Sequence, residues 1–252
     1  MLLLIGAAIG LLLTLTGAGG SVLAVPLLSA GLHTSPTQVM GLSLGCVAMA
    51  AAPGALRGLY RRQIDLRLAL PLALCGIVLA PVGRAVAMLL DPRLVTLLFA
   101  ALAVFIAWQL WPRRQALPLG AAVAKPAVAT ARPLSNLASG ACLGLVSGFF
   151  GVGGGFLIVP WLLRQRRLSA QQAIATSLLV IACVSASGYL FHLQQQTSWA
   201  PGLLLPLALG SLLGACLGMA LAHRLHSGVA QRLVATAAMA TALGLVLQTT
   251  WS

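Results

Sequence analysis

The sequence predicts an all-α polytopic membrane protein made of two homologous repeats. Sixty per cent of its 252 residues are hydrophobic and 7% are charged, which leaves too little polar surface for a water-soluble fold. In addition, a glycine-rich element occurs twice, as Gly17–Ser21 with Pro26 and as Gly151–Gly155 with Pro160. The two copies lie 134 positions apart, and the same separation holds for Ser35 and Ser169, Gln38 and Gln172, and Ser43-Leu44 and Ser177-Leu178. This pattern indicates a tandem duplication.

Each half of the chain contains four apolar segments. They cover residues 2–31, 37–56, 68–90 and 93–111 in the first half, and residues 136–163, 171–191, 200–222 and 229–250 in the second. Between the halves, prolines alternate with small and basic residues, which is typical of a flexible linker rather than of another span. We therefore predict a first transmembrane repeat over residues 1–112, a cytoplasmic linker over 113–133 and a second transmembrane repeat over 134–252.

The first segment of each repeat differs from the other three, because its glycine cluster divides it into limbs of roughly 9 to 15 residues, whereas a transmembrane helix needs about 20. We expect residues 2–31 and 136–163 to form re-entrant hairpins with the glycines at their tips. The remaining three segments of each repeat are then simple crossings, and the two repeats have opposite orientations, as in transporters with inverted repeats. The alternative is eight simple spans.

The distribution of Lys and Arg favours the hairpin topology. With eight simple spans, the 15 basic residues divide eight to seven between the two sides. With two hairpins, thirteen lie on one side and only Arg84 and Arg93 on the other, which is the asymmetry that the positive-inside rule requires. The richer side is then the cytoplasm.

The glycine tips are candidate anion-binding sites. A helix that starts at a tip has backbone amides without internal partners and the positive end of its dipole there, and glycine allows an anion to approach these amides closely. Hydroxyl groups on the following segments provide further donors. The predicted substrate-binding residues are Gly17, Gly19, Gly20, Ser21, Ser43, Gly151, Gly153, Gly154, Gly155, Thr176 and Ser177.

Each of these residue types also has a structural alternative. The hydroxyls can bond back to a carbonyl one turn earlier, and glycines can simply allow close helix packing. We expect packing for the glycines spaced by four residues in the second half, which are Gly144, Gly148, Gly210, Gly214 and Gly218. We expect Pro26 and Pro160 to act as structural hinges after the tips.

Acidic residues are almost absent from the chain. Asp65 and Asp91 are its only two carboxylate side chains, and both lie at the ends of apolar segments. Proton relays and cation sites in membranes generally use an intramembrane carboxylate, so an anion is the expected substrate. The same scarcity argues against a membrane enzyme.

The remaining polar residues indicate neither a metal site nor a nucleic-acid site. The five cysteines are scattered through apolar segments, and the histidines lack accompanying ligands, so we expect no metal and no cofactor. The net charge of +13 follows from the positive-inside rule, and no basic and aromatic pattern for nucleic acid is present. Arg84 lies within an apolar segment, and we expect its side chain to extend to the membrane interface, with steering of an anion as the alternative.

A specific family resemblance rests on the second repeat. The run Gly148-Phe149-Phe150-Gly151-Val152-Gly153-Gly154-Gly155-Phe156-Leu157-Ile158-Val159-Pro160, followed by Ala175-Thr176-Ser177-Leu178, resembles the signature of the sulfite exporter TauE/SafE family, also called the 4-toluene sulfonate uptake permeases. The first repeat departs from this signature at Ser21 and at Gly41-Leu42-Ser43-Leu44. The resemblance implies a multi-pass transporter of the bacterial inner membrane for sulfite, a sulfonate or a related small anion.

Two other function classes stay open on the residues alone. A passive anion channel would use the same glycines, and a non-transporting membrane scaffold subunit would have the same lipid-facing composition. The expected partners are the lipid bilayer and a small anionic substrate, and the sequence leaves open whether the protein is a homo-oligomer.

Overall fold

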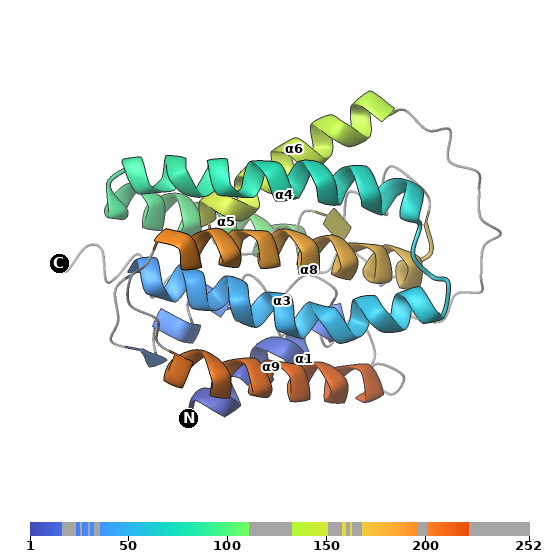
Figure 1. The fold of residues 1–252 in the computed structure, drawn as a ribbon, viewed down its shortest axis with the longest axis horizontal. Helices are drawn as coiled ribbons and strands as arrows, with labels where there is room; N and C mark the ends of the chain where they lie inside the picture. Colours follow the sequence, from blue (N-terminus) through green and yellow to red (C-terminus); the bar gives the residue numbers. More distant parts are fainter. Residues whose placement is uncertain are drawn as a thin grey trace.

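The computed structural model describes residues 1–16, 24–25, 27–29, 31–32, 36–110, 133–150, 158–159, 162, 168–195 and 201–221. Regular structure in these ranges is entirely helical, which confirms the predicted all-α class (Figure 1). The helices are α1 (Leu2–Thr16), α3 (Pro36–Tyr60), α4 (Leu66–Leu89), α5 (Pro92–Leu110), α6 (Pro133–Phe150), α8 (Ala170–Gln195) and α9 (Pro201–Leu221).

Several predicted features lie outside the described residues. They are the two glycine-rich elements at 17–21 and 151–155, Pro26, Pro160, residues 111–132 with almost all of the predicted linker, and the predicted last segment at 229–250. The described parts of α1 and α6 reach Thr16 and Phe150, which directly precede these elements in the sequence.

Four of the helices are long and apolar enough to cross a membrane. These spans are Gln38–Tyr60, Leu66–Leu89, Gln171–Gln194 and Gly202–Leu221, with mean hydropathies between 1.8 and 2.1. Their outward faces are also apolar, since exposed side chains recur every four residues at Leu66, Leu70, Leu74, Val78, Val82 and Val86 on α4 and at Leu205, Leu209, Leu213 and Leu217 on α9. A helix that is apolar on its packed face and on its exposed face belongs in lipid. The protein is a polytopic membrane protein.

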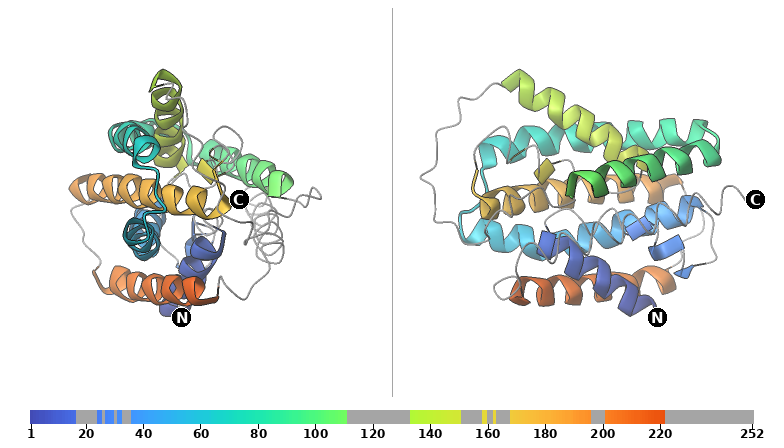
Figure 2. Two further views of the ribbon diagram at one scale, coloured as in Figure 1. Left: turned by 90° about the vertical axis from the view of Figure 1, so that its right-hand side faces the viewer. Right: turned by 180° about the vertical axis from the view of Figure 1, so that it is seen from behind.

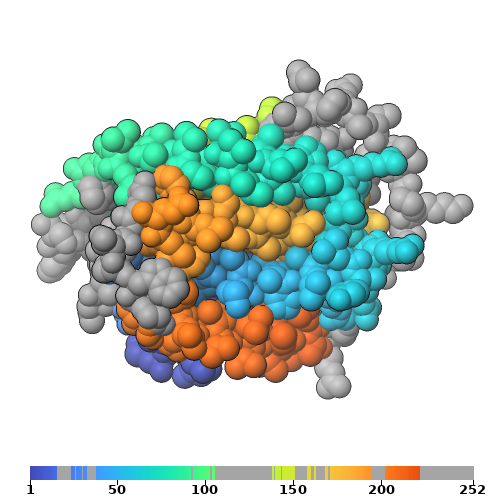
Figure 3. Space-filling view, in the orientation of Figure 1, coloured from blue at the N-terminus to red at the C-terminus, as the bar shows by residue number. Residues whose placement is uncertain are grey.

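The centre of the bundle is the antiparallel pair α3 and α8, whose contact we call the α3–α8 seam. Leu44 on α3 lies against Gly188 on α8, and Gly54 lies against Leu178, so residue numbers rise along one helix as they fall along the other. Helix α4 packs on α8 and α9 packs on α3, and the four form one continuous face (Figure 3). On the opposite face α1 crosses α9 and α6 crosses α4 (Figure 2).

Prolines and short polar caps determine where these helices begin. Proline is the first residue of α3, α5, α6 and α9, a position where its missing N–H has no intrahelical partner anyway. The Asp65 carboxylate caps α4 by accepting from the Arg67 amide at 3.1 Å. At the start of α8, the Ser169 hydroxyl accepts from the Gln172 amide at 3.2 Å, and the Gln172 side chain accepts from the Ser169 amide at 3.3 Å, which is a capping box.

Glycines allow the two crossing pairs to approach closely, as predicted. On α6, a Cβ at Gly144 would lie 2.7 Å from the Gly76 Cα on α4, and one at Gly148 would meet the Ala80 carbonyl. On α9, Gly210, Gly214 and Gly218 face Leu3, Ala7, Leu11 and Thr14 of α1 in the same way. The packing role predicted for these five glycines is confirmed, because any side chain there would collide with the neighbouring helix.

Candidate functional site

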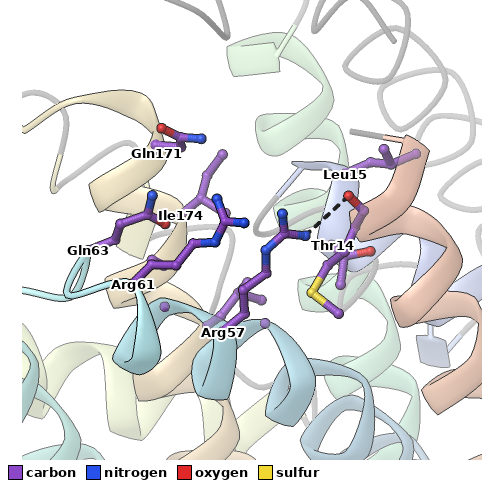
Figure 4. A pocket seen from close by; sticks show the side chains of 12 residues that line it. Thr14, Leu15, Arg57, Arg61, Gln63, Gln171 and Ile174 are labelled. Atoms are coloured by element: carbon purple, nitrogen blue, oxygen red, sulfur yellow. Dashed lines mark hydrogen bonds between the residues drawn. The ribbon is translucent and has the colours of Figure 1, made fainter. Parts of the chain in front are cut away.

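A pocket of about 110 Å³ opens at one end of the α3–α8 seam. It lies where α3 ends and α8 begins, and α1 and α9 form its far wall (Figure 4). Its lining residues are Thr14, Leu15, Gly54, Arg57, Gly58, Arg61, Gln63, Gln171, Ile174, Ala175, Leu178 and Met219. We call this the pocket end of the seam.

The polar lining of the pocket consists largely of hydrogen-bond donors. Arg57 and Arg61 extend from the last turns of α3, and Gln63 and Gln171 lie on the same side (Figure 4). The Arg57 guanidinium also donates to the Met219 carbonyl at 3.4 Å, which links α3 to α9. None of the described lining residues is acidic. Two cationic side chains and two amides, without an acidic side chain among the described lining residues, make this an environment for an anion.

The turn after α3 brings Gln63 to the pocket. The Arg62 amide donates to the Leu59 carbonyl at 3.1 Å, and the Gln63 amide donates to the Gly58 carbonyl at 2.9 Å. With Arg62 in the left-handed region at φ 52°, this is a Schellman motif, in which glycine is the usual residue at that position. The motif reverses the chain within three residues and so leaves Gln63 beside the end of α3.

The predicted hydroxyl ligands on α8 have local partners. Thr176 and Ser177 are fully buried. The Thr176 hydroxyl oxygen accepts from the Asp65 amide at 3.2 Å, which ties α8 to the turn before α4. The Ser177 hydroxyl donates to the Ile174 carbonyl at 2.8 Å, which is the back-bonded alternative that the sequence left open.

The structure does not bring Ser43 and Ser177 together. Both are fully buried and occupy positions 134 apart, but α3 and α8 are antiparallel. From the contacts of Leu44 with Gly188 and of Gly54 with Leu178, Ser177 lies level with about residue 55 of α3. At 1.5 Å of rise per residue this places the two serines about 18 Å apart along the helix axes. Ser177 is near the pocket, and Ser43 is near the opposite end.

The glycine tips lie outside the described residues, but the helices that lead to them are described. Thr14 and Leu15 at the end of α1 line the pocket, so the first glycine-rich element directly follows, in sequence, a helix of the pocket wall. The second follows Phe150 of α6, whose ring lies 5.9 Å from that of Phe99.

Two buried serines, Ser147 on α6 and Ser185 on α8, were not predicted as site residues. Their hydroxyl oxygens have no hydrogen-bond partner, which is uncommon for buried polar groups and calls for an explanation such as a ligand or an ordered water. Ser185 shares a face of α8 with the pocket residues Gln171 and Leu178, at helical spacings of seven. Nothing in the sequence distinguished these serines from others in apolar helices.

A buried arginine at the other end of the seam corrects the prediction for Arg84. Its side chain does not extend to the membrane interface, because it is only 3% exposed and donates to the Met40 sulfur at 2.8 Å. His192 on α8 is 8% exposed, and its ring packs directly on Gly41 of α3. Both side chains therefore lie beside the start of α3, where Met40 and Gly41 are neighbours. We call this the Arg84 end. His192 was missed because it follows the last apolar residues of its segment and matches no motif.

Comparisons with known proteins agree with this architecture. A family model for the sulfite exporter TauE/SafE matches residues 2–245. A protein named "Probable membrane transporter protein" from Xylella fastidiosa (strain Temecula1) is 32% identical over 227 residues, which cover 88% of this chain and 84% of the relative. A second protein of that name, from another strain of the species, is 31% identical over 224 residues, covering 87% and 83%. No solved structure gives a significant match. The chain therefore belongs to the sulfite exporter TauE/SafE family of membrane transporters, and it is not an enzyme.

Proposed function

We propose that this transporter moves a small anion, namely sulfite, a sulfonate or another sulfur-containing anion, across the bacterial inner membrane. The observation that carries this proposal is the pocket, in which Arg57, Arg61, Gln63 and Gln171 converge without an acidic neighbour among the described lining residues. Sulfite and sulfonate groups have several oxygen acceptors and no strong donor. They therefore match a site made of guanidinium and amide donors.

In this proposal the anion passes from the pocket to the glycine tips. The tip residues would offer backbone amides to its oxygens. They are Gly17, Gly19, Gly20 and Ser21 in the first repeat and Gly151, Gly153, Gly154 and Gly155 in the second. Ser43, Thr176 and Ser177 would add hydroxyls from α3 and α8. The unpartnered hydroxyls of Ser147 and Ser185 support a polar path through the interior, because the anion or a water could satisfy them.

We further propose that the two repeats, at 1–112 and 134–252, are inverted around the seam and joined by a cytoplasmic linker. The support is geometric. The contact of Gly54 with Leu178 corresponds to that of Gly188 with Leu44, each residue lying 134 positions from its counterpart. The contacts of α1 and α6 also correspond, since α1 packs on α9 of the other half while α6 packs on α4. Helices α1 and α6 include apolar stretches of 10–17 residues, the length expected for half of a re-entrant hairpin.

Purified protein in liposomes tests the function. Flux would be measured for sulfite, thiosulfate, sulfoacetate, taurine and an aryl sulfonate, with and without an imposed pH gradient, against liposomes without protein. We expect accumulation of at least one anion against its concentration gradient when the pH gradient is imposed. Flux that only follows the concentration gradient would indicate a channel instead, and no protein-dependent flux of any of the five would reject the proposed substrate class.

A further inference from the structure

We propose that Arg84 and His192 form a second binding site for the transported oxyanion, in the half of the pathway opposite the pocket. This inference rests on the proposed function and adds a location and two side chains to it. Its starting point is that an ionisable side chain buried within a membrane segment generally has a functional role. Here Arg84 of α4 and His192 of α8 are both buried, and they contact the neighbouring residues Met40 and Gly41 of α3.

Three helices build the site. Arg84 lies near the end of α4, His192 near the end of α8, and Met40 and Gly41 near the start of α3. The guanidinium donates to the Met40 thioether at 2.8 Å, which is a weak acceptor. An anionic oxygen is a much stronger acceptor, and in a low-dielectric interior it would compete effectively for the same N–H group. The imidazole would add a second donor.

The corresponding positions at the pocket end support the assignment. Positions 134 apart pair His192 with Gly58, Arg84 with Gly218, Met40 with Ile174 and Gly41 with Ala175. The contacts correspond as well. The His192 ring packs on Gly41, and a Cβ at Gly58 would lie 3.0 Å from the Ala175 Cβ. Gly58, Ile174 and Ala175 line the open pocket. The Arg84 end therefore has the same arrangement of α3 and α8, with the His192 imidazole where Gly58 lines the pocket at the other end, whereas Gly218, the counterpart of Arg84, packs on α1.

This correspondence specifies what each end does. The pocket end presents donors at its rim, where Arg61 is exposed. The Arg84 end presents donors deep in the protein, where Arg84 and His192 are buried. When an anion reaches the second site, its oxygens replace the Met40 sulfur as acceptors for the Arg84 guanidinium. The site would bind sulfite or a sulfonate head group, because the planar guanidinium can donate to two oxygens of one group.

The test measures transport from each side of the membrane in right-side-out and inside-out vesicles, with the same five anions as probes. The variants are Arg84→Gln, Arg84→Lys and His192→Gln. Arg93→Gln is the matched control, because Arg93 is an exposed arginine at the start of α5, at the same end of the bundle. Gel filtration in detergent establishes that each variant is folded.

We expect Arg84→Gln to raise the half-saturating concentration at least about tenfold from the side that Arg93 faces, the loss typical of a charge-assisted hydrogen bond. From the Arg57 side the change should be less than about threefold. Arg84→Lys should lose less, since it keeps the charge, and His192→Gln should show the same sidedness. Arg93→Gln should stay within about twofold of the wild type.

Three outcomes would overturn the inference. The first is a half-saturating concentration in folded Arg84→Gln equal to that of the wild type. The second is an equal rise in Arg93→Gln, and the third is a rise of the same size from both sides of the membrane. If Arg84→Gln does not fold, Arg84→Lys and His192→Gln test the site instead. Half-saturating concentrations equal to that of the wild type in both variants would reject it. Failure of the wild type to transport any probe would reject the proposed function, and this inference with it. Normal wild-type transport with an unaffected Arg84→Gln rejects the inference alone.

Discussion

The two ends of the α3–α8 seam have the same helix arrangement but different contents. At the pocket end Gly54 lies against Leu178, and at the Arg84 end Gly188 lies against Leu44. Yet a pocket is present at the first end, and Arg84 and His192 are buried at the second. Side-chain volume contributes to the difference, because His192 corresponds to Gly58, which lines the pocket.

The two ends also differ in how strongly their charges can act. Arg61 at the pocket is exposed, so salt screens it and it contributes little to binding. Arg84 is almost fully buried, and its hydrogen bonds act in a medium of low dielectric constant. The pocket is thus suited to attracting an anion, and the buried cluster to holding one.

The relation between the two ends depends on their lying on opposite sides of the membrane. Single cysteines at positions 31 and 165, in a background without native cysteines, would be labelled on intact cells with an impermeant thiol reagent. We expect labelling at position 31 only, because the inverted topology places the ends of the two hairpins on opposite sides. Equal external labelling at both positions would contradict the inverted topology and favour eight spans.

Gly58→His would make the pocket end resemble the Arg84 end. A Cβ there would already lie 3.0 Å from Ala175 and from Ile64, so the imidazole must occupy the pocket. We expect flux to fall at least about tenfold, equivalent to roughly 1.4 kcal/mol, with the amount of folded protein unchanged. Gly202→His is the control, since nothing lies within 4 Å of a Cβ there. Equal flux in the two variants would show that the pocket is not on the pathway.

Thr176→Val tests a contact that exists only at the pocket end. It removes the acceptor of the Asp65 amide, whereas the residue 134 positions earlier is Leu42, which cannot accept such a bond. We expect a loss of about 1–3 kcal/mol of stability, the cost of leaving a partly buried donor unsatisfied, measured as a lower thermal unfolding midpoint in detergent. Thr176→Ser keeps the hydroxyl and should unfold near the wild-type temperature. Identical midpoints for Val and Ser would argue against this hydrogen bond.

Arg61→Gln should have the smallest effect of the series. An exposed charge contributes about 0.2–1 kcal/mol, so the half-saturating concentration from the pocket side should rise by less than about fivefold. The rise should shrink in about 1 M salt, where charges are screened over a few ångströms. A salt-independent effect of tenfold or more would mean that Arg61 binds the anion directly in a buried site.

Much of the fold could be predicted from the residues alone. Composition identified lipid as the solvent, and the apolar segments predicted helices, which are the only regular structure among the described residues. The packing glycines could be recognised from their spacing of four, because helical periodicity is a local property. The site was less predictable. The sequence identified Thr176 and Ser177 as buried hydroxyls, but not the pocket arginines, Ser147, Ser185 or His192 as site residues.

Two features were decided only by the tertiary structure. Ser43 and Ser177 are equivalent in sequence, but the antiparallel seam places them in opposite halves, because a two-fold relation brings equivalent residues together only near its axis. Arg84 lies near a helix end, where its side chain could turn outward or inward, and it turns inward to contact Met40 of α3. The sequence by itself determined the solvent, the helices and the family. Only packing between different helices decided which polar groups meet, because that choice rests on tertiary contacts that no local pattern encodes.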